Sequence, residues 1–307
     1  MSEYLRRAAC PCCGAGAERA EPAVASRPSA EDLPFDRHSS FVSGYSANRI
    51  FFTYYRCRDC SALYCPVFYG EDQLGKLYGR QAENMSDVPL PARERTQNGY
   101  AELLMQHSRG SSGFLEIGAD IGLFASRCAQ LGRFERFWFY EPNREVHAEL
   151  AARFAGRTHT IRAEMWPSAD LPPACCSTAA LIHVLDHLLD PAKFLARIRD
   201  ALEPGGVILA VTHNAASLLA RALGRRFPPF ALQHPQLYSP ASIRRLLERA
   251  GYEVLRIADA VNYFPLMHLV RGGLAVFGMP TVAPQLQGPT LPIKLGNMAV
   301  VARKRIG

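Results

Sequence analysis

The stretch that decides the fold is FLEIGADIGLF, residues 114–124. A short apolar run is followed by a turn that contains Gly118 and Gly122, and apolar residues then recur at helical spacing. A strand, a glycine-containing turn and a helix in this order form a ligand site at the carboxyl edge of a sheet. Asp120 stands where the dinucleotide pattern G-x-G-x-x-G needs glycine, which argues against NAD.

The pattern of a strand followed by a helix continues to the end of the chain. It predicts a Rossmann-like, doubly wound, mostly parallel seven-stranded sheet with helices on both faces. The second strand ends in Glu141, where a carboxylate can accept hydrogen bonds from both hydroxyls of a ribose, although a solvated acid at a strand end would look the same. The seven expected strands lie at about 114–117, 137–140, 158–162, 178–184, 207–211, 253–258 and 298–302.

Four segments in this order resemble the class I S-adenosylmethionine-dependent methyltransferases, over about residues 93–304. They are FLEIGADIGLF (114–124), FYEPN (139–143), LIHVLDHLLDPAKFL (181–195) and LEPGGVILAVTHN (202–214). The resemblance implies methyl transfer from S-adenosylmethionine. Asp120 departs from the family's middle glycine in the first of these motifs.

The resemblance also implies roles for single residues. Glu116 would hold the methionine amino group and Glu141 the ribose diol, Glu164 and Met165 would flank the adenine, and His183 would sit near the transferable methyl group. The positions that it assigns to cofactor binding are Glu116, Gly118, Asp120, Gly122, Glu141, Glu164, Met165 and His183.

Two C-x-x-C knuckles lie near the N-terminus. Zinc prefers four tetrahedral thiolate or imidazole ligands, and two such knuckles supply four thiolates, which would make a closed structural site. Ordinary buried thiols or a redox pair are the alternatives, and Cys12 could replace a neighbour. The expected zinc ligands are Cys10, Cys13, Cys57 and Cys60.

These features divide the chain into a zinc-ribbon-like module over residues 1–70, a linker over 71–92 and a methyltransferase domain over 93–307. Insertions at about 215–238 and 261–295 are expected to border the acceptor site. The apolar segment 263–279 is expected to be a lid or a homodimer contact.

A base is needed only when the methyl acceptor must lose a proton. The candidates are His183, His187 and His234, with His213 as a further possibility. A metal site formed by His183, Asp186 and His187 is an alternative, as is a purely structural role in which His187 packs and Asp186 caps a helix.

Arginine dominates the segment 217–249, which holds six arginines and one acid. We expect Arg221, Arg225 and Arg226 to share about one helical face and to bind a phosphate or carboxylate on the acceptor. Tyr238 is a further candidate for acceptor contact. The alternative for the arginines is a solvated basic face.

The net charge of +7 over 307 residues includes no run of five basic residues, so nucleic acid is an unfavoured partner. A nucleic-acid-modifying enzyme with a zinc reader and a catalytically inactive scaffold remain as rival functions. No apolar run approaches the roughly 20 residues of a membrane-spanning helix, and no signal-peptide pattern is evident. The expected compartment is therefore the cytoplasm.

Overall fold

The structure, a computed structural model, describes residues 4–41, 49–70, 72–74, 88–164, 171–280 and 286–306. Its centre is a seven-stranded sheet with the spatial order β12-β15-β10-β9-β6-β7-β8. β15 runs antiparallel to both of its neighbours, and the other strands run parallel to one another. The predicted mostly parallel sheet is confirmed. The strands are β6 (Gly113–Ile117), β7 (Arg136–Tyr140), β8 (His159–Arg162), β9 (Cys176–Ile182), β10 (Leu202–His213), β12 (Tyr252–Asp259) and β15 (Asn297–Lys304).

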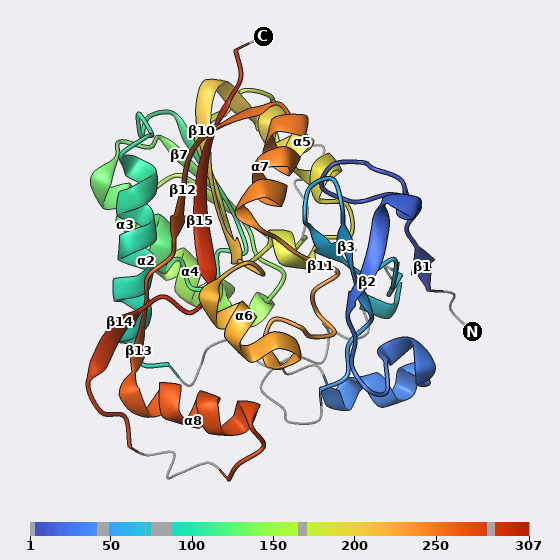
Figure 1. The fold of residues 1–307 in the computed structure, drawn as a ribbon. Coiled ribbons are helices and arrows are strands. Elements are labelled where there is room, and N and C mark those ends of the chain that lie inside the picture. The colour runs from blue at the N-terminus through green and yellow to red at the C-terminus, as the bar shows by residue number, and fades with distance from the viewer. Residues whose placement is uncertain are drawn as a thin grey trace.

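Helices cover both faces of this sheet (Figure 1). Side chains alternate along each strand, so Phe114 packs with the core under α2 and α3, whereas Leu115 and Ile117 pack with the core under α5 and α7. The helices are α2 (Leu90–Met105), α3 (Leu123–Leu131), α4 (His147–Arg153), α5 (Pro191–Ala201) and α7 (Pro240–Arg249).

The N-terminal region forms a small sheet of its own with the order β11-β4-β3-β2. Its edge strand β11 (Gln236–Leu237) comes from the insertion after β10 and pairs antiparallel with β4. The module is therefore completed by a strand from the insertion that follows β10 (Figure 1). Its other strands are β2 (Ala20–Val24), β3 (Tyr54–Cys57) and β4 (Leu63–Tyr64), and β1 (Leu5–Arg6) pairs with β5 (Val67–Phe68).

Two local expectations are corrected. Residues 15–48 are rich in Ala, Ser, Pro and Glu, a composition that predicts an irregular loop, yet β2 lies within them because it pairs with β3. The helix α2 begins at Leu90, inside the expected linker, and Pro91 fits its first turn because proline needs no amide donor there.

Both insertions carry structure near the lower end of the sheet in Figure 1. The first contains α6 (Leu218–Leu223) and the 3₁₀ helix η6 (Gly224–Arg226), and the second contains β13 (Asn262–Pro265), α8 (Leu266–Val276) and β14 (Thr290–Ile293). Among the described residues, no helix is long and apolar enough to cross a membrane.

Candidate active site

From β6 the chain adds β7 and β8 on one side of the sheet, and it then crosses to the other side and adds β9 and β10. The neighbours β6 and β9 therefore flank the point where the order of the strands reverses. The loops that follow these two strands meet there. A Cβ on Gly118, whose φ is +73°, would lie 3.0 Å from Cγ2 of Val184. Glycine is thus required at position 118 by both its backbone conformation and the close loop. Such a switch point is where open α/β sheets bind ligands.

Gly122 has a different reason to be glycine. Its φ is +80°, and a Cβ there would lie 2.6 Å from Cδ1 of Leu150. The residue lets the start of α3 pack against α4, so helix packing accounts for this glycine.

Two buried carboxyl groups stand at the carboxyl ends of β6 and β7. Glu116 is 2% exposed, and its Oε2 has no hydrogen-bond partner among the described residues. Burial, together with the charges of Glu141 and Asp120, raises the pKa of Glu116 well above its ordinary value. A buried carboxylate with an unused acceptor is suited to a cationic group such as an ammonium.

Glu141 already organises the loop around it. Its Oε2 accepts from the backbone N–H of Asp120 at 2.8 Å, and its Oε1 accepts from that of Asn143 at 2.8 Å. Burial raises the pKa of Glu141, and these two hydrogen bonds oppose the rise. Each carboxylate oxygen retains a second lone pair, so hydroxyl groups of a ligand can still be accepted.

The remaining expected cofactor residues are placed as follows. Asp120 has a φ of +49°, and its carboxylate lies 3.8 Å from Nη2 of Arg93 at the surface. Glu164 is exposed just after β8. Met165 lies outside the described residues.

Four histidines gather at the carboxyl ends of β9 and β10. Ring centroids are 4.9 Å apart for His183 and His213, 5.0 Å for His213 and His234, and 4.7 Å for His234 and His187. Burial lowers the pKa of all four, to about 4 for His183 and for His234. The cluster is neutral at pH 7.

His183 and His187 do not lie on one helical face. His183 has a φ of +54°, and only a short 3₁₀ turn, η5 (Leu185–His187), follows it. His183 therefore faces His213, whereas His187 faces His234.

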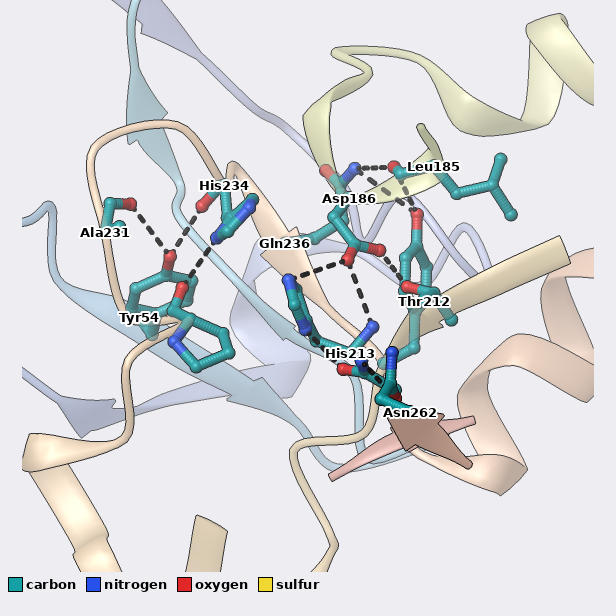
Figure 2. Close-up of polar contacts among 12 residues, drawn as sticks. Tyr54, Leu185, Asp186, Thr212, His213, Ala231, His234, Gln236 and Asn262 are labelled. Carbon is teal, nitrogen blue, oxygen red and sulfur yellow. Dashed lines mark hydrogen bonds and ion pairs between the residues drawn. The ribbon is translucent and has the colours of Figure 1, made fainter. Parts of the chain in front are cut away.

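Asp186 is completely buried beneath this cluster. Its carboxylate accepts from the hydroxyl of Thr212 and from the backbone N–H of His213, the latter at 3.1 Å (Figure 2). Its Oδ2 also lies 3.7 Å from Nε2 of His213. Asp186 thereby joins the loop after β9 to the end of β10.

Asn297 is a site residue that the sequence did not reveal. Its Oδ1 lies 2.8 Å from Nδ1 of His213, although 84 positions separate the two in the chain. It stands at the start of β15, and no local pattern in the sequence marks the contact.

The acceptor candidates are only partly brought together. Arg221, Arg225 and Arg226 are exposed, but they do not share one helical face, because α6 ends before Gly224, whose φ is +51°. The Arg226 guanidinium lies 5.5 Å from the ring centroid of Phe277. Tyr238 is completely buried and donates to the carbonyl of Leu185 at 2.9 Å, so its hydroxyl serves the core.

The two N-terminal knuckles come together as expected. The four Sγ atoms of Cys10, Cys13, Cys57 and Cys60 all lie within 4.8 Å of one another. Two Sγ pairs, Cys10 with Cys60 and Cys13 with Cys57, are each 3.6 Å apart, which fits thiolates about 2.3 Å from one tetrahedral ion. Cys12 is buried beside them, and hydrogen bonds with Cys10 and Cys60, together with burial, raise its pKa.

A family model described as "Methyltransferase domain" matches residues 92–257, more than half of the chain, and the chain belongs to this family. With its mixed seven-stranded sheet, it is an S-adenosylmethionine-dependent methyltransferase.

Two curated relatives agree with this class, and one solved structure shares the fold. A "Probable S-adenosylmethionine-dependent methyltransferase" of Mycolicibacterium smegmatis is 29% identical over 55% of this chain and 67% of its own length. The "Ubiquinone biosynthesis O-methyltransferase" of Dinoroseobacter shibae is 25% identical over 45% of this chain and 59% of its own length. A chain in the complex of the Haloferax volcanii Trm112 methyltransferase activator with a methyltransferase has a TM-score of 0.52 at 10% identity, over 70% of this chain and 93% of that chain.

Proposed function

We propose that the protein transfers a methyl group from S-adenosylmethionine to a small-molecule acceptor that carries a phosphate or carboxylate. The observation that carries the proposal is the arrangement along one sheet edge. Two buried carboxyl groups end β6 and β7, and a neutral histidine cluster ends β9 and β10 beside them.

The buried carboxyl groups fit the cofactor. Glu116 would accept from the methionine ammonium group, because its Oε2 is buried without a partner. Glu141 would accept from the ribose hydroxyls, and Gly118 leaves room beside the loop after β9. S-adenosylmethionine supplies an activated methyl group on a sulfonium, so the chain's main task is to position the two reactants.

The histidines are suited to receive a proton from the acceptor. His183, His187 and His234 remain our candidates for this role, because neutral imidazoles can accept a proton without first losing one. Their low pKa makes each a weak base, so the acceptor hydroxyl must itself be acidified or already ionised.

The arginines support an anionic acceptor. Arg221, Arg225 and Arg226 are exposed on the insertion that follows β10, and no acid stands between residues 215 and 247. A guanidinium pairs with a phosphate or carboxylate through two parallel hydrogen bonds. Arg225 and Arg226 are adjacent on η6 and are the favoured pair.

The cysteine cluster is proposed to hold one structural Zn²⁺. Four thiolates complete a tetrahedral shell and leave no position for water, so this ion would stabilise the fold and take no part in methyl transfer. None of the nine cysteines forms a disulfide bond, as is usual in the reducing cytoplasm, which is the proposed compartment. The rival roles in nucleic-acid modification and as an inactive scaffold would leave the small-molecule assay below without product.

The test is transfer of isotopically labelled methyl from S-adenosylmethionine to a panel of matched anionic and neutral acceptors. Arg225→Ala and Arg226→Ala should raise KM for the anionic acceptor about tenfold, since each removes a charge-assisted hydrogen bond. The control is Arg133→Ala, an exposed arginine just after α3, far along the chain from the insertion. An unchanged KM for the anionic acceptor in Arg225→Ala and Arg226→Ala, with a neutral acceptor turned over as well as the matched anionic one, would refute the anionic acceptor.

A further inference from the structure

Three side chains at the end of β9 and β10 offer metal ligands to one point. His183, Asp186 and His213 each contribute one ligand atom, and these atoms lie within 4.8 Å of one another. Two imidazoles and one carboxylate form a set that binds first-row transition ions with coordination positions to spare. This set differs from the expected trio, because His213 takes the place of His187.

The tautomer of His213 is fixed by its surroundings. Asn297 Nδ2 donates to Asn262 Oδ1 at 3.3 Å, so its Oδ1 faces His213 and accepts from Nδ1–H at 2.8 Å. The proton of His213 is therefore on Nδ1, and Nε2 carries a lone pair. Ligating histidines in metal sites are held in this way by a second hydrogen bond.

The Nε2 lone pair has an acceptor opposite it. Asp186 Oδ2 lies 3.7 Å from Nε2 of His213, so a carboxyl oxygen and a ring nitrogen, each able to bind a metal ion, stand close together next to the buried Asp186. Bonds of about 2.1 Å from a single ion to nitrogen and to oxygen can span up to about 4.2 Å, so one ion fits between them.

His183 adds the third ligand from a constrained backbone. Its φ of +54° is uncommon for a residue other than glycine, and its Nδ1 is buried without a hydrogen-bond partner among the described residues. Unusual backbone conformations of this kind are concentrated at functional sites. A buried ring nitrogen without a hydrogen-bond partner is available to bind a metal ion.

We propose that His183, Asp186 and His213 bind a divalent first-row transition ion, of the zinc or iron(II) class, which holds an acceptor through two neighbouring oxygens. The acceptor class is a vicinal diol, a catechol or a hydroxy acid. This inference rests on the proposed methyl transfer for its chemical role, whereas binding of the ion itself does not.

The ion would acidify the acceptor. A hydroxyl bound to a divalent cation loses its proton more readily. His183 is then a ligand, so His187 and His234, whose ring centroids are 4.7 Å apart beside the site, are left to pass that proton to water. The acceptor oxygen then forms its bond to the methyl carbon while the methyl–sulfur bond breaks. The electron pair of that bond stays on sulfur, and S-adenosylhomocysteine leaves as a neutral thioether.

The test begins with metal content. Tag-free protein is stripped with a chelator, titrated with Zn²⁺ or Co²⁺ and dialysed, and bound metal is counted by elemental analysis. The wild type should bind two ions per chain. Cys57→Ser should keep the ion at the histidine site and lose the thiolate-to-cobalt absorption, because only the cysteine site has sulfur ligands.

His183→Gln and His213→Gln should each bind one ion per chain and keep the thiolate absorption. Asn297→Ala should lower the affinity of the histidine site for its ion about 10–100-fold, because the ring of His213 loses the hydrogen bond that orients it. The matched control is His159→Gln, a histidine on β8 whose Nδ1 lies 2.9 Å from the carbonyl oxygen of Arg157, away from both proposed metal sites. It should bind two ions.

One ion per chain in the wild type, all of it lost in Cys57→Ser, would overturn the proposal even if methyl transfer were normal. Two ions with no loss in His183→Gln and His213→Gln would overturn it as well. Conversely, two ions that disappear as expected, in a protein that does not bind S-adenosylhomocysteine, would contradict the proposed function and leave the metal site standing.

Discussion

Glu116 shows at the scale of one residue how a binding site can oppose stability. Its carboxyl group is buried without a partner for Oε2, and the nearby Glu141 and Asp120 add negative charge. Because the folded state raises its pKa, the unfolded chain ionises first as the pH rises above about 4.5, so ionisation favours unfolding. The ligand-free protein should therefore lose stability from this group as the pH increases.

Glu116→Gln tests this directly. At pH 8 the free energy of unfolding should be about 1–2 kcal/mol higher for the variant than for the wild type, both without ligand. Near pH 4 this difference should vanish, because Glu116 is then protonated in both the folded and the unfolded wild type. Its affinity for S-adenosylhomocysteine should fall about 10–100-fold, since an ammonium group loses a charged acceptor. Denaturant titration and calorimetry measure the two effects.

Glu253→Gln, at an exposed position on β12, is the control and should change neither quantity. A Glu116→Gln protein that is less stable at pH 8 yet binds the cofactor normally would contradict the assignment.

Among the elements, β11 joins the two parts of the molecule. Gln236 on this strand donates from Nε2 to the carbonyls of Leu185 and Leu188, at 2.9 and 2.8 Å, and accepts from Nη1 of Arg7 at 2.9 Å. One buried amide thus ties the N-terminal module to the loop that carries His187. The position of the histidine cluster depends on this strand.

Gln236→Leu keeps the volume and removes these hydrogen bonds. We expect the free energy of unfolding to fall by about 2–4 kcal/mol, because two buried carbonyls and one guanidinium lose a partner. Urea titration against Gln130→Leu, an exposed glutamine on α3, isolates the effect of burial. Equal stability of the two variants would show that the amide does not join the parts.

The sequence predicted the helices and strands better than the long-range contacts between them. The hydrophobic period revealed all seven strands. Asp190 and Ser239 cap α5 and α7 through their side chains. The strand β11 could not be expected, because two residues carry no period and their pairing depends on β4. The contact of Asn297 with His213 likewise depends on the long-range pairing of β15 with β10.

At the scale of the whole molecule, the cysteine site and the methyltransferase sheet share one core. Cys10 and Cys57 pack in the same cluster of buried residues as Leu115, Ile198 and Leu246. The chain was expected to divide near residue 70, but this shared cluster and β11 run across that boundary. Loss of the ion should therefore reach beyond the N-terminal module.

Cys57→Ser should lose the proposed structural zinc and should speed amide exchange in β3 and in β9 together, with a single unfolding transition at lower temperature. Cys128→Ser, a buried cysteine outside the cluster, is the control for metal content. Faster exchange confined to β3, with β9 unchanged, would mean that the module unfolds on its own.

The central claim is that the carboxyl edge of the sheet binds S-adenosylmethionine through Glu116 and Glu141. Calorimetric titration of the wild type and Glu141→Ala with S-adenosylhomocysteine tests it most directly. The wild type should bind one molecule per chain, and the affinity of the variant should be about 5–150-fold lower, a loss of about 1–3 kcal/mol. Unchanged affinity in Glu141→Ala, or tight binding of NAD in place of S-adenosylhomocysteine, would contradict it.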